Sequence, residues 1–301
     1  MSKILISGGS GLIGRHISKL LIESNHNVAW LSREGGSWNG VKKHIWDPNN
    51  GIIDESAFEG IDHIIHLAGS GIVDKRWTAS YKKEIIDSRV KSCELIYKVV
   101  EKKSIKLKSF IGCSAIGFYG AKQSDNLVYE TNLPGENFYS ESCVLWEKSY
   151  ESIKNLGIRT VIIRTGIVLS KNSGAYPKMA LPFKLGIGAA IGSGKQNFPW
   201  IHIDDIARLF VYTLFNEQLD GVYNAVASEI INNKEFSELL AKSLNRPFFI
   251  PALPSSILKF VMGEGACVVT EGLKISNEKI KKEGFIFKFE KSKDALSDIA
   301  F

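Results

Sequence analysis

A glycine-rich turn near the amino terminus constrains the fold of this chain more than any other stretch. The apolar run 4–6 leads directly into Gly8-Gly9-Ser10-Gly11-Leu12-Ile13-Gly14, and apolar residues then recur at helical spacing as far as Leu21. This order predicts a strand, a tight turn and a helix. Gly8, Gly11 and Gly14 permit the turn, a close backbone approach to a diphosphate and close packing of helix on strand. The unpaired N–H groups at the start of the helix, around Leu12 and Ile13, are suited to bind the anion.

The second predicted strand, 27–32, indicates which dinucleotide would be bound. It ends at Ser32 and Arg33, about 20 residues beyond the glycines, where dinucleotide-binding folds place an acidic residue on the ribose of NAD or an arginine beside the 2′-phosphate of NADP. No acidic residue occupies this strand end, and a hydroxyl next to a guanidinium suits a phosphate. NADP is therefore predicted over NAD, and a solvated loop charge is the alternative role of Arg33.

Strands and helices alternate along the rest of the chain. The further predicted strands are 41–46, 61–69, 108–113, 158–164 and 221–226. This alternation predicts an α/β fold with a Rossmann-type, doubly wound parallel sheet and a smaller C-terminal substrate lobe. The expected division is an NAD(P)-binding domain of 1–165, to which 200–228 returns, and a substrate lobe of 166–199 and 229–301 that includes a module of about 247–301.

Several polar or small residues follow the predicted strands and could face a ligand. Asp47 could contact the adenine, or could stabilise the turn before Pro48. The small residues in Leu67-Ala68-Gly69 let the backbone approach a cofactor, whereas His66 is interpreted as a structural hydrogen-bonding partner. Lys75 and Arg76 could hold an anionic group of a substrate, or could be solvated charges before a helix.

The fifth predicted strand delivers Ser114 to the place where a nicotinamide would lie. The sequence then continues to Tyr119-Gly120, and a second tyrosine, Tyr139, follows at the start of a predicted helix. Together with the glycine turn and His66-Leu67-Ala68-Gly69, this combination resembles the atypical, extended short-chain dehydrogenase/reductase superfamily.

Other motifs narrow the resemblance to an epimerase-like branch. They are Lys75-Arg76-Trp77-Thr78, Ser114 to Gly120, Trp146-Glu147, Arg164 to Leu169, Gly192 to Gln196 and Trp200 to Asp205. The branch, family 39U, includes proteins described as sugar-nucleotide epimerases or as similar to cell-division inhibitors, with a C-terminal domain of unknown function. The resemblance covers nearly the whole chain and implies NADP binding more firmly than it implies a reaction.

The sequence departs from the superfamily at a residue on which its chemistry depends. There the active-site tyrosine is followed four residues later by a lysine, which lies beside the phenol and favours its ionised form. Here Tyr139 is followed by Cys143, and Lys148 falls on the opposite face of the helix. A phenol without a nearby cation is a poor base at neutral pH, so the pKa of Tyr139 is expected to stay near its ordinary value.

Three side chains remain candidates for the chemistry. Ser114 would orient a carbonyl or hydroxyl group, with Tyr119 or Tyr139 as proton donor, although Tyr119 could instead simply pack over the cofactor. Cys143 could be a nucleophile, but a small buried residue is the preferred interpretation because no base lies nearby in the sequence. Lys195-Gln196 and Trp200-Ile201-His202 could meet the substrate, whereas Asp204-Asp205 is expected to cap a helix.

Composition limits the other classes of function. The net charge of +6 is spread along the chain, which argues against nucleic acid as a partner. The four cysteines lack metal-ligand spacing, so no metal site is predicted and a reducing compartment is expected. No apolar run is long enough to cross a bilayer. The expectation is a cytoplasmic protein, or one of an organelle whose targeting segment has been removed, since the cofactor strand begins at once.

Two functions follow as hypotheses. The first is an NADP-dependent oxidoreductase or epimerase-like enzyme that transfers hydride to or from a small polar molecule. The alternative is a non-catalytic sensor or regulatory module that binds NADP(H), which the absent lysine favours. Related proteins pair two helices in a homodimer, and 77–100 and 138–155 would be the corresponding helices here. The sequence identifies neither the substrate nor the direction of reaction.

Overall fold

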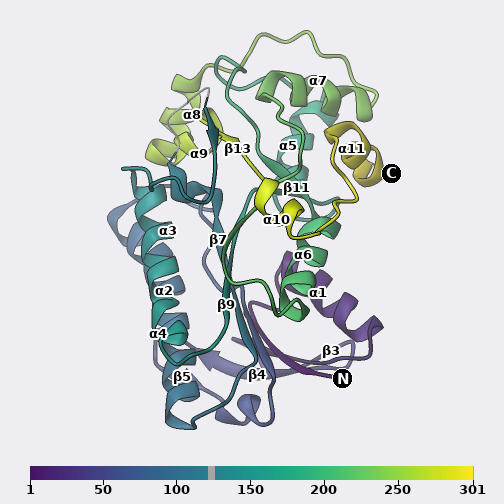
Figure 1. The fold of residues 1–301 in the computed structure, drawn as a ribbon. Coiled ribbons are helices and arrows are strands. Elements are labelled where there is room, and N and C mark those ends of the chain that lie inside the picture. The colour runs from purple at the N-terminus through teal and green to yellow at the C-terminus, as the bar shows by residue number, and fades with distance from the viewer. Residues whose placement is uncertain (121–125, 301) are drawn as a thin grey trace.

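A computed structural model of the chain describes residues 1–120 and 126–300, and it contains the predicted parallel sheet (Figure 1). The parallel strands are β1 (Lys3–Ser7), β2 (Asn27–Ser32), β4 (Val41–Asp47), β6 (His63–His66), β7 (Ser109–Ala115), β9 (Thr160–Thr165) and β12 (Gly221–Ala225). Their order in the sheet is β12-β9-β7-β6-β1-β2-β4-β3. The chain winds outward from β1 in both directions, so the carboxyl ends of β1 and β6 form the switch point where such sheets bind ligands.

Two short strands extend this sheet in a way that the sequence interpretation missed. β3 (Gly36–Trp38) and β5 (Ile52–Ile53) both pair antiparallel with β4. They occupy the connections on either side of β4, for which the sequence analysis named no strand. The ring of Trp38 stacks on Trp30 at 4.9 Å between centroids, so this apolar residue covers the sheet edge.

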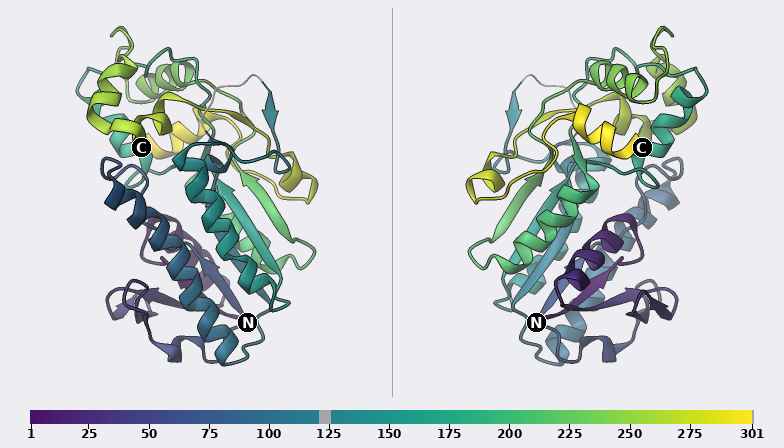
Figure 2. Two further views of the ribbon diagram at one scale, coloured as in Figure 1. Left: turned by 90° about the vertical axis from the view of Figure 1, so that its left-hand side faces the viewer. Right: turned by 90° about the vertical axis from the view of Figure 1, so that its right-hand side faces the viewer.

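Helices cover both faces of the sheet. α1 (Leu12–Glu23) and α6 (Ile203–Phe215) lie side by side on one face, and α2 (Ala79–Lys102), α3 (Phe138–Ser149) and α4 (Glu151–Lys154) lie on the other (Figure 2). The short 3-10 helices are η1 (Glu55–Phe58), η2 (Ile116–Tyr119) and η3 (Gly263–Ala266). The helix predicted for 138–155 is divided at Tyr150, because α3 ends at Ser149 and α4 begins at Glu151.

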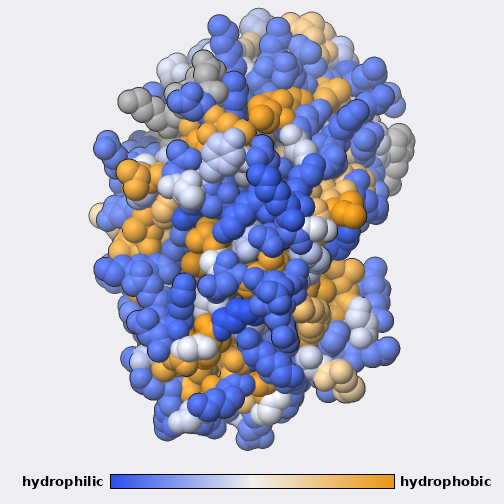
Figure 3. Space-filling model, in the orientation of Figure 1, coloured by the Kyte–Doolittle hydropathy of each residue, from blue (hydrophilic) through white to orange (hydrophobic). Residues whose placement is uncertain are grey.

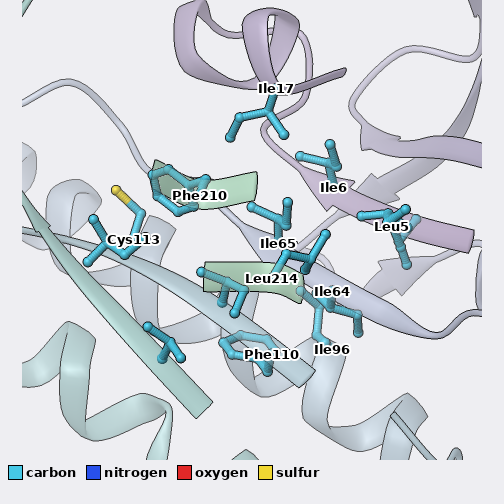
Figure 4. Packing of buried hydrophobic residues seen from close by; sticks show 14 of the residues in the cluster. Leu5, Ile6, Ile17, Ile64, Ile65, Ile96, Phe110, Cys113, Phe210 and Leu214 are labelled. Carbon is cyan, nitrogen blue, oxygen red and sulfur yellow. The ribbon is translucent and has the colours of Figure 1, made fainter. Parts of the chain in front are cut away.

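The main core lies between the sheet and these helices. Ile6 and Ile65 from neighbouring strands meet Ile17 of α1 and Phe210 of α6, and all four side chains are fully buried (Figure 4). Central strands covered on both faces read as continuous apolar runs, which is why the sequence identified them without alternation.

A second apolar cluster lies above the carboxyl ends of the strands and joins β10 (Ile167–Leu169), α5 (Ala175–Lys184), β11 (Trp200–His202), α7 (Asn233–Ser243) and α11 (Ser292–Ala300). The other helices of this part of the chain are α8 (Ser255–Met262), α9 (Cys267–Thr270) and α10 (Glu278–Lys282). β8 (Leu127–Val128) and β13 (Lys274–Ile275) pair beside them. The sequence interpretation treated 170–199 as irregular, and α5 is the exception: Pro182 lies inside it, which disguised the helix.

The C-terminal segment is tied to α6 by the Trp200–Asp205 motif. The buried Asp205 carboxylate accepts hydrogen bonds from the backbone N–H groups of Lys288 and Phe289, each at 2.8 Å. His202, not an aspartate, is the N-cap of α6, because its Nδ1 accepts from the N–H of Asp204 at 3.2 Å. The expected capping role of Asp204-Asp205 is corrected accordingly: Asp205 holds the C-terminal segment.

Candidate functional site

The turn between β1 and α1 has the geometry of an anion site. Gly8 has φ +71°, and Gly11 precedes the helix without a side-chain cap, which leaves the first N–H groups of α1 available. A Cβ on Gly14 would lie 2.6 Å from the carbonyl oxygen of Gly8, and a Cβ on Gly8 would lie 3.0 Å from the backbone nitrogen of Ala68. The turn is therefore closed by backbone-to-backbone contacts that exclude any side chain at these glycines.

A cavity of about 630 Å³ adjoins this turn. Gly11, Leu12 and Arg15 of the turn and α1 line one side, the loop 170–173 lines the other, and Asp204 and Asp298 also line the cavity. No acidic residue lies in the first turn of α1. The positive end of the helix dipole thus opens onto a space large enough for a phosphate group.

Ser32 and Arg33 stand at the carboxyl end of β2, next to the strand that carries the turn. Arg33 is exposed, and within residues 1–120 and 126–300 it forms no hydrogen bond or ion pair. The hydroxyl of Ser32 accepts only a long hydrogen bond, 3.4 Å, from the N–H of Glu34. Both groups can therefore turn to a phosphate without breaking a strong contact.

Asp47 is engaged in a turn. One carboxylate oxygen accepts from the N–H of Asn49 at 3.0 Å, and the other accepts from the Asn50 side chain at 2.6 Å. The Asn50 bond is the largest cause that lowers the pKa of the carboxyl. The turn function left open in the sequence is present, and a contact with adenine stays a prediction.

Ser114 lies at the end of β7 but is committed to a neighbouring carboxylate. Its hydroxyl is 1% exposed and donates to Glu147 Oε1 at 2.6 Å. Glu147 also receives Nε and Nη2 of Arg164, both at 2.8 Å, in a nearly buried bidentate ion pair. In this arrangement the Ser114 proton cannot be donated to a substrate carbonyl, so the role expected from the sequence needs this bond to break first.

Tyr119 is hydrogen-bonded within the fold. Its hydroxyl donates to Asn224 Oδ1 at 2.7 Å and accepts from Arg164 Nη1 at 2.9 Å. Burial raises the pKa of this phenol, although Arg164 opposes the effect. Asn224 donates onward to the carbonyl of Ser276, at 3.0 Å. The proton of Tyr119 is therefore used to join the sheet to the C-terminal segment.

Tyr139, unlike Tyr119, has a hydroxyl whose proton is not used in a hydrogen bond among the described residues. Its ring lies against Gly117, and among the described residues nothing hydrogen-bonds to its hydroxyl. Burial raises its pKa, and so do Cys143 and Cys267, while Arg89 lowers it. The ordinary pKa expected from the sequence is thus corrected upward. Burial likewise raises the pKa of Cys143 to about 12, which fits the small buried residue and not a nucleophile.

Arg89 is the functional candidate that the sequence interpretation missed. It lies on the buried face of α2, where Tyr81, Ile85 and Ile96 are also buried. Its Nη1 donates to the carbonyl of Ile85 at 2.9 Å, its guanidinium lies 4.6 Å from the Trp146 ring centre, and no carboxylate pairs with it among the described residues. A Cβ on Gly69 would lie 3.2 Å from its Cζ. The sequence feature that could have revealed it is the spacing: Arg89 occupies a position on the buried face of an amphipathic helix, where an apolar residue is expected.

The remaining candidates lie elsewhere or serve the fold. His66 bonds Ser7 at 2.6 Å and Ser92 at 3.2 Å, as a structural partner would. Gln196 is buried and donates to the carbonyls of Ile191 and Val269. Trp200, Ile201 and His202 are all buried in β11, and His202 also lines the cavity at the glycine turn. Lys75 pairs with Glu84 at 3.5 Å.

A parallel sheet with a glycine turn at its switch point and a free arginine beyond the next strand defines an NAD(P)-binding protein of the Rossmann class. The model of the NAD dependent epimerase/dehydratase family matches residues 4–225, and the domain of unknown function DUF1731 matches residues 253–299. The chain belongs to the NAD dependent epimerase/dehydratase family, and the resemblance to the extended short-chain dehydrogenases is confirmed.

Named relatives span the whole chain. The epimerase family protein SDR39U1 of Mus musculus is 33% identical over 99% of both chains, and YfhF of Bacillus subtilis is 31% identical over 98% of this chain and 97% of its own. Human SDR39U1, crystallised with NADPH, superposes with a TM-score of 0.88 at 30% identity over 99% of both chains. A UDP-glucose 4-epimerase of Thermus thermophilus with NAD, at 19% identity and a TM-score of 0.76, shows the same fold. In residues 1–120 and 126–300, no helix has the length and apolar character to cross a membrane.

Proposed function

We propose that the protein is an NADP-dependent oxidoreductase that reduces a carbonyl group of a small molecule by hydride transfer. The observation that carries the proposal is the open anion site at the glycine turn, with the unpaired guanidinium of Arg33 beyond the next strand. The NADPH in the crystal structure of human SDR39U1 supports the same cofactor. Gly8, Gly11, Leu12, Ile13 and Gly14 would hold the diphosphate, and Ser32 and Arg33 the 2′-phosphate.

The residues present fit this cofactor at its other end as well. The backbone of Leu67 and Ala68 passes directly against Gly8 of the turn, and Gly69 follows. Arg89 lies against Gly69, and among the described residues its guanidinium donates to the carbonyl of Ile85 and has no carboxylate partner. A buried cation without a partner is costly, and an anionic or hydroxyl-bearing ligand at this place would offset that cost. We therefore assign Arg89 to the cofactor, in the place that the missing lysine leaves.

The bound nicotinamide would supply the hydride, and the chain would supply the proton. Tyr139 is the candidate donor, because its phenol is protonated at neutral pH and, among the described residues, no hydrogen bond engages its hydroxyl. The same property makes it a poor base, so oxidation of an alcohol, with which epimerisation begins, is disfavoured. The ion pair of Glu147 and Arg164 holds Ser114 at the end of β7. The alternative function is a sensor that binds NADP(H) without turnover, and Cys143 in place of lysine favours it. A sensor would exchange no hydride with any carbonyl compound, whereas the enzyme would.

Replacing Arg33 with alanine should lower the affinity for NADPH about 10- to 100-fold, since charge-assisted hydrogen bonds to a phosphate are lost. Affinity for NADH should change less than two-fold. Titration of cofactor fluorescence measures both. Lys19→Ala removes an equal charge from the exposed face of α1 and should change neither value. An unaltered ratio of the two affinities in Arg33→Ala would remove the assignment of NADP.

Replacing Arg89 with methionine should weaken NADPH binding about 10-fold while leaving the unfolding midpoint unchanged or higher. The apolar stem is kept, and an unpaired charge leaves the interior. Calorimetric titration and thermal unfolding of the same preparation separate the two effects. Lost stability with intact affinity would show instead that Arg89 serves only the packing of α2 on Trp146.

A further inference from the structure

Apart from Arg89, the surroundings of Tyr139 are largely apolar and come from three distant parts of the chain. Trp77, Tyr81 and Ile85 form a buried cluster, against which pack the partly buried side chains of Ile72, Phe138, Tyr139, Cys267 and Val268. Residues 72–85 belong to the loop after β6 and the start of α2. Phe138 and Tyr139 begin α3, and Cys267 and Val268 lie in the C-terminal segment. The phenol proposed to donate the proton is thus a member of an apolar cluster.

The polar atoms of Trp77 and Tyr81 are hydrogen-bonded to backbone carbonyl groups. The indole N–H of Trp77 donates to the carbonyl of Ile72 at 2.7 Å, and the hydroxyl of Tyr81 donates to the carbonyl of Gly71 at 2.6 Å. The Trp77 and Phe138 rings meet edge to face, with centroids 5.0 Å apart. Trp77 and Tyr81 are buried, so what the cluster can offer a ligand beside the Tyr139 hydroxyl is the ring and aliphatic surface of its partly buried members, such as Phe138 and Val268.

The C-terminal segment is held onto this cluster. A Cβ on Gly265 would lie 3.3 Å from the Trp77 ring, and Glu264 forms an ion pair with Lys82 of α2. Cys267 and Val268 follow directly. Burial raises the pKa of the Cys267 thiol to about 11, as expected in apolar surroundings. The segment therefore adds further apolar side chains around Tyr139.

The lysines around the cluster are already neutralised. Lys75 pairs with Glu84 at 3.5 Å, Lys178 with Asp74 at 3.3 Å, and Lys82 with Glu264. The exposed Arg76 side chain lies against the backbone of Gly263. A sugar linked to a nucleoside diphosphate brings two negative charges, which need charge-assisted donors when they leave water. Arg76 could provide one such donor, and a second would require a paired lysine to give up its carboxylate.

Exposed apolar side chains continue outward from the cluster. Val73 in the loop after β6 is 38% exposed, and Phe260 and Val261 on α8 are 83% and 65% exposed. None of the eight residues of α8 is buried. The face seen in Figure 3 likewise carries apolar patches between its hydrophilic side chains.

We propose that the compound reduced beside Tyr139 is an uncharged, largely apolar ketone or aldehyde, and not a nucleoside-diphosphate sugar. The inference rests on the proposed function and names its substrate class. It replaces the small polar molecule expected from the sequence. The carbonyl carbon gains the hydride and the oxygen gains the phenol proton, so the carbonyl becomes an alcohol while NADPH is oxidised to NADP⁺. Tyr139 recovers its proton from solvent.

Binding at equilibrium tests the substrate class without turnover. The protein saturated with NADP⁺ is titrated with acetophenone, with 2-decanone and with UDP-glucose by calorimetry. The two ketones should bind at least 10-fold more tightly than UDP-glucose. Tighter binding of UDP-glucose, or binding of neither ketone to protein that holds NADP⁺, would overturn the inference and leave the cofactor assignment intact. Failure of NADP⁺ itself to bind would refute the proposed function.

A second test of the substrate class introduces a negative charge into the apolar cluster around Tyr139. Val268→Asp should weaken ketone binding at least 10-fold, with NADP⁺ affinity within two-fold of the unaltered protein. Ile286→Asp, at a 76% exposed position of the same C-terminal segment, is the matched control and should change neither. If Val268→Asp does not fold, Val268→Thr replaces a methyl by a hydroxyl at nearly constant volume and should weaken ketone binding about three-fold. Unchanged ketone affinity in the folded variant would contradict the proposal.

Discussion

Gly14→Ala is expected to lower the affinity for NADPH at least 100-fold. A Cβ at this position would lie 2.6 Å from both the carbonyl oxygen of Gly8 and the Cα of Gly9. These are backbone atoms of the turn itself, so no side chain can move aside, and α1 must shift away from β1. The N–H groups of α1 would then no longer converge on the diphosphate. Fluorescence titration with NADPH measures the loss.

Gly157→Ala supplies the control for this variant. Gly157 is exposed in the connection between α4 and β9, and a Cβ there would meet nothing within 4 Å. Its φ of +76° means that alanine should cost about 1 kcal/mol of stability. NADPH affinity should stay unchanged in this variant. A Gly14→Ala protein that folds and binds NADPH as before would show that the turn is not the diphosphate site.

The features predicted from the sequence are those that local spacing specifies. The β1 strand, the glycine turn and α1 follow one another within 21 residues of chain, and each is recognised by its own periodicity. The parallel sheet followed because buried strands alternate with amphipathic helices, and its order obeys the doubly wound pattern. Arg33 was found in the same way, from its distance along the chain.

The features that were missed depend on contacts between distant residues. Ser114 could be placed at a strand end, but the bond to Glu147 joins positions 33 residues apart and decides what the hydroxyl can donate. Tyr119 and Asn224 are separated by 105 residues. Arg89 was visible as a residue of a helix, yet its lack of a carboxylate partner is a property of the packed structure alone.

The absent lysine has a different meaning once these contacts are known. In the superfamily one cation serves both the phenol and the cofactor. Here the cation near Tyr139 is Arg89, which comes from α2 and not from the helix of the tyrosine. Burial still raises the pKa of the phenol, so the phenol is protonated at neutral pH. Under the proposed function, Tyr139 would donate the proton and Arg89 would hold the cofactor.

Acid should destabilise the protein from about pH 6.5 downward, because two histidines are buried in the neutral form. Burial lowers the pKa of His66 to about 3 and that of His63 to about 4. In the unfolded chain both have a pKa of about 6.5. Between these values the unfolded state binds protons that the folded state does not, so the free energy of unfolding falls as the pH falls. At pH 4.5 the loss should be about 2 kcal/mol or more for each histidine, a large part of an ordinary domain's stability.

The onset of this loss distinguishes histidines from carboxylates. Asp54, whose pKa is lowered to about 2 chiefly by its hydrogen bond with Ser56, begins to contribute to acid unfolding only below about pH 4, where unfolded aspartate takes up its proton. Urea unfolding between pH 7.5 and 5 therefore isolates the histidines. His63→Gln and His66→Gln should each remove up to one proton from the slope of stability against pH, and the double variant both. A double variant with an unchanged slope would mean that the two rings are charged within the fold, against the apolar contacts of His66 with Phe110 and Tyr150.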